Sequence, residues 1–215
     1  MILRRTLKIA LPLFVALIFT GCATVSQEWS SDVPSVNKSS KAKRAPKINI
    51  DKESVDGLSA PYSDLWDRIR DGFELEVADD PLVIKHVRWY ADRPDYVDRM
   101  MSRSSRYLFY IVEEVERRKM PMELALLPFI ESAFNPGAFS RAKASGMWQF
   151  MPATGKDFKL TQNVFRDERR DVIQSTDAAL DYLQRLYKMF GDWQLVLAAY
   201  NWGEGNVGKA IAQAL

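Results

Sequence analysis

The chain has 215 residues, of which 47% are hydrophobic, and it carries a formal net charge of +2. This length and composition suffice for one sizeable core, or for one core with a tail. Removing Arg4, Arg5 and Lys8 at the extreme N-terminus changes the balance from 30 basic against 28 acidic residues to 27 against 28. The remaining chain is close to neutral, which argues against a nucleic-acid-binding protein.

The first 22 residues have the pattern of a secretory signal peptide. A basic start is followed by an apolar run over residues 9–20. This run is shorter than the roughly 20 apolar residues that cross a bilayer. Cys22 ends the segment and is the only cysteine, so no disulfide can form within the chain.

Residues 18–22, Ile-Phe-Thr-Gly-Cys, resemble a bacterial lipobox, in which the cysteine is lipidated and becomes the new N-terminus. Phe19 departs from that pattern, which prefers leucine. A free exposed thiol outside the cytoplasm is reactive, which favours lipidation of Cys22 over an ordinary cleaved signal. By analogy with lipoprotein sorting, Ala23 favours the outer membrane. We expect an outer-membrane lipoprotein facing the periplasm, with a soluble periplasmic protein as the alternative.

Residues 23–60 are poor in apolar side chains and rich in Ser, Lys, Asn, Asp and Pro. Such a segment cannot bury enough surface to fold alone, so it is expected to be a flexible linker. Residues 61–215 are then expected to form the folded domain. Its apolar residues recur at helical spacing, and it contains no convincing alternating run and no internal repeat, so we predict an all-α fold.

The expected helices follow capping signals and breakers along the chain. They lie at 65–73 after Asp64, 81–90 after Asp80, 94–115, 121–131, from the cap Ser175-Thr176-Asp177 to 190, at 193–200 after Gly191-Asp192, and in a short stretch ending near Leu215.

Glu131 stands out because a carboxylate follows the apolar run Leu-Leu-Pro-Phe-Ile. On a helix from Pro121, Leu124, Leu127 and Glu131 share one face, with a kink expected at Pro128. That face looks inward, which places the carboxyl at the edge of the core. Desolvation there is expected to raise its pKa and favour the protonated acid near neutral pH. Taken alone, the stretch also permits a glutamate that points into solvent.

Other catalytic groups have little support in the sequence. With one histidine and one cysteine there is no transition-metal constellation and no nucleophile–histidine pair with convincing spacing. The lone His86 is expected to be structural. The acids that follow Glu131 lie in polar, charged sequence and are expected on the surface or in loops: Asp157, Asp167, Glu168 and Asp171.

Three segments carry the strongest functional signal. They are the Glu131 segment (residues 131–136, Glu-Ser-Ala-Phe-Asn-Pro), the Gln149 segment (residues 146–149, Gly-Met-Trp-Gln) and the Tyr200 segment (residues 198–203, Ala-Ala-Tyr-Asn-Trp-Gly). In this order, behind a lipoprotein signal, the set resembles the soluble lytic transglycosylase family, which shares the goose-type lysozyme fold. The resemblance covers residues 62–215.

The resemblance implies an enzyme of cell wall turnover. It would cleave the β-1,4 bond between N-acetylmuramic acid and N-acetylglucosamine in peptidoglycan without water, leaving a 1,6-anhydromuramoyl end. Most glycosidases need two carboxylates. A single acid suffices if the substrate's N-acetyl oxygen stabilises the cationic centre and its own C6 hydroxyl closes the ring.

Residue roles follow from the same resemblance. Glu131 matches the acid and base, and Ser140 matches a serine that orients the N-acetyl group of the substrate. Ser132 is expected to belong to the substrate-binding residues and to fix the turn beside Glu131. The residues that match positions lining the sugar groove are Met147, Gln149, Tyr200 and Asn201, with Trp148 as either a stacking platform or a core residue. No metal or organic cofactor enters. The expected partners are peptidoglycan strands and, through Cys22, outer-membrane lipid.

The sequence departs from the family at its end. Relatives continue past the Tyr200 segment into a helix that brings another tyrosine to the cleft, and close relatives carry LysM repeats. The sequence stops at Leu215, so we expect a C-terminally truncated catalytic domain. A hydrolytic muramidase of the same fold and an inactive peptidoglycan-binding lipoprotein are the alternative functions.

Overall fold

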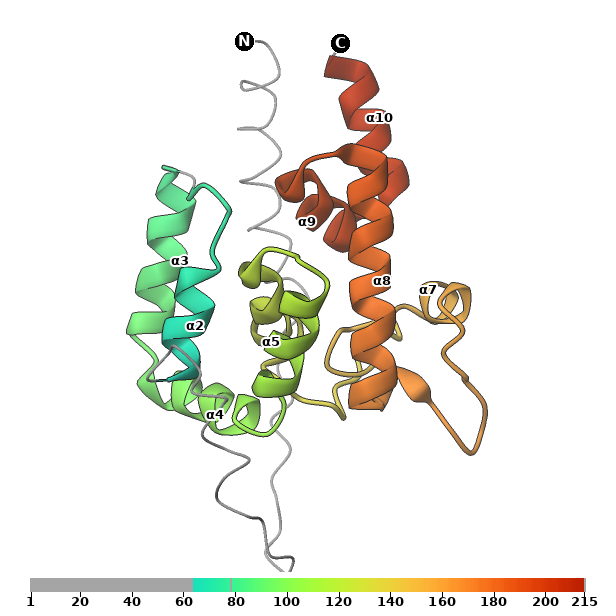
Figure 1. The fold of residues 1–215 in the computed structure, drawn as a ribbon. Helices are drawn as coiled ribbons and strands as arrows, with labels where there is room; N and C mark the ends of the chain where they lie inside the picture. Colours follow the sequence, from blue (N-terminus) through green and yellow to red (C-terminus); the bar gives the residue numbers. More distant parts are fainter. Residues whose placement is uncertain (1–63, 78, 215) are drawn as a thin grey trace, which may run out of the picture.

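The computed structural model of the protein describes residues 64–77 and 79–214. The predicted signal peptide, the lipidation site at Cys22 and the whole predicted linker (23–60) lie outside these residues. Helices dominate the described part (Figure 1), in which no strand forms and only isolated bridges occur, such as Phe139 with Ser145 and Ser145 with Phe150. The predicted all-α class is confirmed.

Most of the helices follow one another with short connections, and the longest connection covers residues 133–151. In chain order they are α2 (Leu65–Asp71), α3 (Pro81–Ala91), α4 (Pro94–Ser104), α5 (Leu108–Arg117), the 3-10 helix η2 (Met122–Leu126), α6 (Leu127–Ser132), α7 (Pro152–Asp157), the 3-10 helix η3 (Glu168–Arg170), α8 (Val172–Phe190), α9 (Trp193–Trp202) and α10 (Glu204–Ala214).

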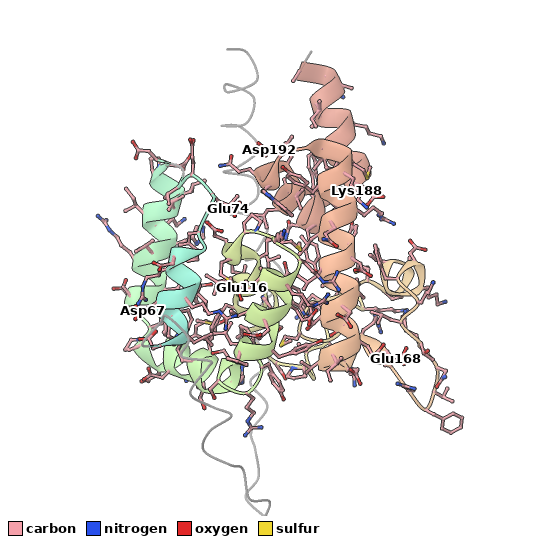
Figure 2. The ribbon with its side chains drawn as sticks, in the orientation of Figure 1. Asp67, Glu74, Glu116, Glu168, Lys188 and Asp192 are labelled. Atoms are coloured by element: carbon pink, nitrogen blue, oxygen red, sulfur yellow. The ribbon has the colours of Figure 1, made fainter. Side chains whose placement is uncertain are left out.

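Helix α8 is the long element against which much of the fold is assembled. It packs on α5, η3 and α9, while η2 contacts α2, α5 and α6. Figure 2 shows α8 running from the region of Glu168 at one end to Lys188 near the other. Its apolar face meets those of α5 and α9 in a core of buried aliphatic side chains: Ile111, Val112, Val115, Leu180, Leu183, Leu186 and Val196. No helix in residues 64–77 and 79–214 is both long and apolar enough to cross a bilayer.

Several predicted helix boundaries are confirmed by their caps. The Asp64 side chain accepts hydrogen bonds from two N–H groups in the first turn of α2, and Asp80 caps α3 in the same way. Gly191 adopts the left-handed conformation that ends α8, and Asp192 caps α9. Short polar side chains at a helix start satisfy amides that lack partners within the helix, which is why these boundaries could be predicted.

The predicted helix 94–115 is instead two helices, separated at residues 105–107. The Ser104 hydroxyl donates to the Met101 carbonyl, and the Ser105 hydroxyl donates to the Ser102 carbonyl. Such side-chain bonds compete with the backbone hydrogen bonds of a helix, so the serine pair gives a physical reason for the break. The first predicted helix also ends earlier, at Asp71, leaving Phe73 outside it.

The predicted helix 121–131 is also divided, into η2 and α6. Pro128 lies in the first turn of α6, where a missing N–H has no partner to lose, so it starts a helix rather than kinking one. Helix α8 begins at Val172 with Asp171 as its cap, not at Ser175-Thr176-Asp177. Thr176 is buried instead, because its hydroxyl accepts a hydrogen bond from the Trp148 indole N–H.

Candidate active site

The backbone reverses direction directly after Glu131. Ala133 and Phe134 both have positive φ, at 51° and 56°, and their N–H groups return to the Phe129 and Pro128 carbonyls. This conformation is unfavourable for residues other than glycine. Burial of Phe134, whose ring packs 4.4 Å from that of Phe129, holds it in place. The reversal leaves the carboxyl of Glu131 at the edge of the core, as the sequence predicts.

The Glu131 carboxyl is partly buried, and burial raises its pKa from 4.5 to about 7. Burial alone causes the shift, and no Lys or Arg in residues 64–77 and 79–214 forms an ion pair with it. The predicted direction of the pKa shift is therefore confirmed. Ile130, the last residue of the apolar run before Glu131, shields the carboxyl from water less than that run predicts, because it is 40% exposed. Phe134, which is fully buried, and Phe129, which is partly buried, provide the apolar surroundings nearby.

Ser132 connects the Glu131 segment to the Gln149 segment. Its hydroxyl donates to the Met147 carbonyl at 2.8 Å and accepts a hydrogen bond from the Asn135 N–H at 3.2 Å. A hydroxyl can donate and accept at once. Ser132 therefore fixes the turn beside Glu131, as predicted, and also links that turn to a second part of the chain.

The Gln149 segment is a tight turn that depends on glycine. Gly146 has φ of +84°, and a Cβ atom there would lie 1.7 Å from the Arg169 carbonyl oxygen. On either side of the turn, Ser145 and Phe150 exchange backbone hydrogen bonds of 3.0 and 3.1 Å. The Gln149 amide folds back to donate to the Gly146 carbonyl at 2.8 Å. Only glycine permits this close approach of two backbones.

The Tyr200 segment reaches the same turn from α9. The Tyr200 hydroxyl donates to the Trp148 carbonyl at 2.9 Å. Burial raises the pKa of Tyr200 well above 10, and the nearby charge of Glu131 raises it further. Ser132 and Tyr200 thus bind two consecutive carbonyls, and through them the three predicted segments form one site.

The remaining predicted residues have different positions. Met147 is only 1% exposed, so its side chain lies in the core. This differs from the prediction, which placed it in the wall of the sugar groove. Trp148 is buried as well and is a core residue, not a stacking surface. Ser140 is partly exposed, and its hydroxyl accepts from the Ala144 N–H at 3.0 Å in the loop before the Gln149 segment. Asn201 is partly exposed beside Tyr200.

The structure also reveals residues that sequence reasoning missed. Three aromatic rings connect the end of the Gln149 segment to Tyr200: Phe150 lies 6.5 Å from Phe158, Phe158 lies 5.2 Å from Tyr182, and Tyr182 lies 5.5 Å from Tyr200. Their spacing along the chain carries no local pattern that would have identified them. Met151, two residues after Gln149, is 44% exposed, whereas Met147 is buried. Since both residues are methionines, their residue type could not show which of them is exposed.

Three of the four acids that were expected on the surface or in loops make structural contacts, and the fourth, Asp157, is exposed. Asp167 binds Arg169, and the pKa of its carboxyl is lowered by that hydrogen bond. Glu168 accepts the Thr161 N–H, which lowers its pKa, and Asp171 caps α8. Glu168 is only 9% exposed, which contradicts the expected surface position. Within the described residues, Glu131 is the carboxyl whose pKa is raised, and no group of three or more possible metal-ligating side chains was found.

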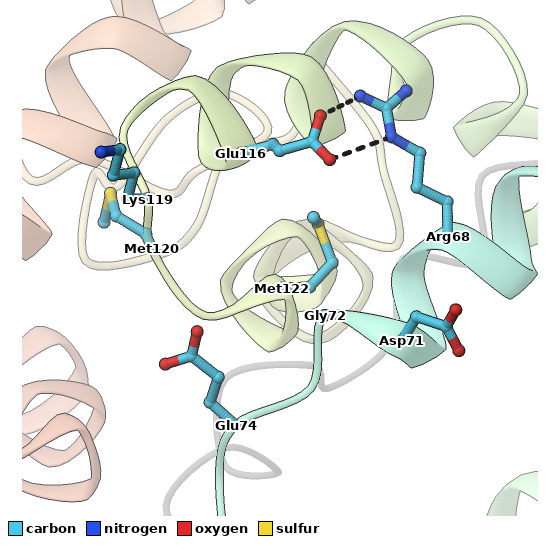
Figure 3. Close-up of a pocket in the computed structure, with 8 residues that line it drawn as sticks. All are labelled: Arg68, Asp71, Gly72, Glu74, Glu116, Lys119, Met120 and Met122. Atoms are coloured by element: carbon cyan, nitrogen blue, oxygen red, sulfur yellow. Dashed lines mark hydrogen bonds and ion pairs between the residues drawn. The ribbon is translucent and has the colours of Figure 1, made fainter. Parts of the chain in front are cut away.

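A cavity of about 200 Å³ lies elsewhere, between the ends of α2 and α5 and the start of η2. Figure 3 shows Arg68 and Glu116 paired along its wall, with Met122 at the base. None of its lining residues belongs to the three segments. Arg68 and Glu116 are engaged with each other. Glu131, the carboxyl whose pKa is raised, does not line this cavity, so the cavity does not compete with it as the chemical centre.

The chain is similar to one known family and to several known proteins. Residues 109–214 match the family model described as Transglycosylase SLT domain. The chain is 46% identical over 158 residues to membrane-bound lytic murein transglycosylase D of Escherichia coli (strain K12) and to that of Escherichia coli O6:H1 (strain CFT073), covering 73% of this chain and 35% of each relative. It is 52% identical over 112 residues to an Alteromonas sp. (strain M-1) protein named for tributyltin chloride resistance, covering 52% of this chain and 54% of that protein. The chain thus spans about a third of the length of the E. coli relatives.

Proposed function

Because the chain belongs to the transglycosylase SLT domain family, we propose that it is a peptidoglycan lytic transglycosylase. It cleaves the β-1,4 bond between N-acetylmuramic acid and N-acetylglucosamine and leaves a 1,6-anhydromuramoyl end. The observation that carries the proposal is the Glu131 carboxyl, whose pKa burial raises to about 7 at the meeting point of the three segments. The name of the E. coli relatives, which specifies a murein transglycosylase, supports the same reaction.

A pKa near 7 suits a group that must both give and take a proton at neutral pH. Protonated Glu131 donates to the glycosidic oxygen as its bond to C1 of muramic acid breaks. The N-acetyl oxygen of the substrate stabilises the cationic C1. The Glu131 carboxylate then removes the C6 hydroxyl proton while O6 bonds to C1. The proton count balances without water, and Glu131 returns to its starting state.

Neighbouring residues support this cycle in distinct ways. The Tyr200 hydroxyl hydrogen is committed to the Trp148 carbonyl, so its oxygen retains acceptor capacity for the acid or the substrate. Gln149 uses one amide N–H on Gly146 and keeps its oxygen for a sugar hydroxyl. Ser140 orients the N-acetyl group and Asn201 lines the groove. Met147 contributes its carbonyl, which holds Ser132, rather than its side chain.

The test is the chemistry of the product. Purified protein is incubated with sacculi, and the released muropeptides are analysed by mass spectrometry. Anhydromuramoyl ends are expected from the wild-type protein and not from Glu131→Gln, which preserves shape but cannot donate the proton. Reducing muramic ends would identify a hydrolytic muramidase. Binding to sacculi without any release would identify a wall-binding protein.

The proposed location is the periplasmic face of the outer membrane, with lipid on Cys22. The name "membrane-bound" of the E. coli relatives supports an attachment to membrane. Mass spectrometry of the mature N-terminal peptide tests it directly. A diacylglyceryl-modified Cys22 is expected, and the Cys22→Ala variant should leave the membrane fraction. An unmodified N-terminus with a free thiol would instead indicate a soluble periplasmic protein.

A further inference from the structure

A polar cluster ties the end of the Tyr200 segment to α8. Tyr182 donates from its hydroxyl to Glu204 Oε2 at 3.2 Å. Arg185, one turn further along α8, donates from Nη2 to both Glu204 oxygens, at 3.2 and 3.0 Å. Glu204 is the first residue of α10. The two side chains of α8 therefore hold the corner between α9 and α10 through a single carboxylate.

The same cluster contacts Tyr200 from a second side. The Tyr182 ring lies 5.5 Å from the Tyr200 ring, with 39° between their planes. The Arg185 guanidinium lies 5.0 Å above the Tyr182 ring and 4.9 Å above Phe158. Tyr182 is buried, so its ring has little freedom. Tyr200 is thus packed against a ring that Glu204 and Arg185 hold in place.

We propose that Tyr182, Arg185 and Glu204 form a positioning cluster that holds the Tyr200 hydroxyl on the Trp148 carbonyl, next to the Met147 carbonyl that binds Ser132 beside Glu131. This positioning role rests on the proposed function, since the cluster acts on Tyr200, which was assigned to that reaction. Gly203, with φ of +92°, forms the corner between Tyr200 and α10. The cluster connects the two sides of this corner. A displacement of about 1 Å in a site of this kind can lower the rate by 100-fold.

The geometry distinguishes positioning from simple stabilisation. The Arg185 and Glu204 side chains are 42% and 36% exposed. Ion pairs this accessible to water contribute little to folding stability. Loss of the Glu204 carboxylate should therefore leave the melting temperature close to that of the wild type. An effect on turnover would then come from the altered position of Tyr200.

The experiment is a double-mutant cycle between Glu204→Ala and Tyr200→Phe, with sacculi as substrate. Glu204→Ala is expected to lower kcat about tenfold with KM nearly unchanged. In the Tyr200→Phe background the same change should lower kcat less than about twofold, because the cluster acts through the Tyr200 hydroxyl. Tyr182→Phe should behave like Glu204→Ala. Glu116→Ala, which removes a carboxylate from the Arg68 ion pair, is the matched control and should not change kcat.

A second measurement does not depend on turnover. In protein with ¹³C-labelled tyrosine, the Tyr200 ring should flip slowly in the wild type and in Glu116→Ala, and faster in Glu204→Ala. Equal flip rates in all three, an unchanged kcat, or a tenfold loss that persists in Tyr200→Phe would each overturn the positioning role. Absence of anhydromuramoyl product from the wild type would instead remove the proposed function and leave the NMR result to decide whether the cluster holds Tyr200.

Discussion

Two glutamates in this fold lose much of their contact with water, yet their pKa values move in opposite directions. Glu131 meets apolar surroundings without a cation, and burial raises its pKa to about 7. Glu168 accepts the Thr161 N–H and pairs with Arg166 at 2.7 Å, and the pKa of its carboxyl is lowered. A carboxylate that receives hydrogen bonds stays ionised, whereas one that is only desolvated prefers its proton. Only the second can serve as an acid near neutral pH.

The same contrast extends to the two regions around them. The turn over residues 161–170 is held by charged contacts: Asp167 with Arg169, and Arg169 with the Lys143 and Phe150 carbonyls. The Glu131 region is held mainly by neutral groups, through Ser132 and Tyr200, and Arg103 donates to the Ala133 carbonyl at 3.4 Å. The Glu131 carboxyl itself forms no ion pair within the described residues, and burial alone shifts its pKa.

Substituting the two glutamates separately is the strongest test of the contrast. Glu131→Gln is expected to lower kcat by about 10³- to 10⁴-fold, because the proton donor and acceptor is lost. Glu168→Gln should lower kcat less than about threefold, since Glu168 has no part in proton transfer. Initial rates of muropeptide release from sacculi measure both.

The two variants also provide each other's control. Circular dichroism should show a native helical spectrum for Glu131→Gln, so that its inactivity cannot be assigned to unfolding. An active Glu131→Gln protein, or an equally inactive and well-folded Glu168→Gln protein, would show that the acid had been assigned to the wrong region.

Gly146 is where the two regions touch, and its substitution should produce the next largest effect. Gly146→Ala places a methyl group against the Arg169 carbonyl and requires a positive φ. We expect a loss of about 4 kcal/mol or more in the free energy of unfolding. Urea denaturation measures it.

Gly208→Ala is the matched control. Gly208 lies in α10, and a Cβ there would meet no atom within 4 Å. Alanine is the better helix former, so this change should stabilise the protein by up to about 1 kcal/mol. If Gly146→Ala left the free energy of unfolding unchanged, the two regions would be able to separate. The close approach of Gly146 to the Arg169 carbonyl would then not define the Gln149 turn.

Much of the site could be predicted from local sequence. The apolar run before Glu131 indicates a desolvated carboxyl, and the direction of its pKa shift is confirmed. The Ser132 hydroxyl could be assigned to the turn because it lies next to Glu131. Caps such as Asp64 and Asp192 carry their own short-range signal. Each of these predictions depends on residues within a few positions of each other.

Contacts across the fold could not be predicted in this way. The burial of Glu168 depends on the Thr161 backbone, and the link from Tyr182 to Glu204 spans 22 residues. Thr176 resembles a helix cap in sequence, but its hydroxyl accepts a hydrogen bond from the Trp148 indole N–H. Met147 and Met151 are chemically identical, and only the turn at Gly146 decides which is buried. Periodicity contains none of this information.

Substituting Arg169 tests whether the charged turn over residues 161–170 supports the Glu131 region. Its side chain lies almost fully out of solvent and donates to Asp167 and to the Lys143 and Phe150 carbonyls. Arg169→Met removes these donors and takes from Asp167 the shorter of its two ion pairs, which should lower the free energy of unfolding by about 3 kcal/mol. Arg141→Met is the control, because Arg141 is exposed to solvent. Equal stability of the two variants would show that the buried arginine is dispensable.

The smallest expected effect is a pH-dependent difference between wild type and Glu131→Gln. The pKa of Glu131 is about 7 in the folded protein, above the ordinary 4.5. A raised pKa means that the folded state holds the proton more tightly than the unfolded state. The stability that this contributes is complete below about pH 4.5 and is lost as the pH rises toward 7.

From pH 5 to pH 8, the wild type should therefore lose about 2.5 kcal/mol relative to Glu131→Gln, which cannot ionise. Denaturation of both proteins in the same buffers isolates this term, because all other titrating groups are shared. Over the same range Glu168→Gln should show almost no pH-dependent difference, since a lowered pKa stabilises the folded state above the ordinary value of 4.5 and the benefit disappears only at more acidic pH. A Glu131→Gln difference that stays constant across this range would mean that the carboxyl is ionised at neutral pH and cannot be the proton donor.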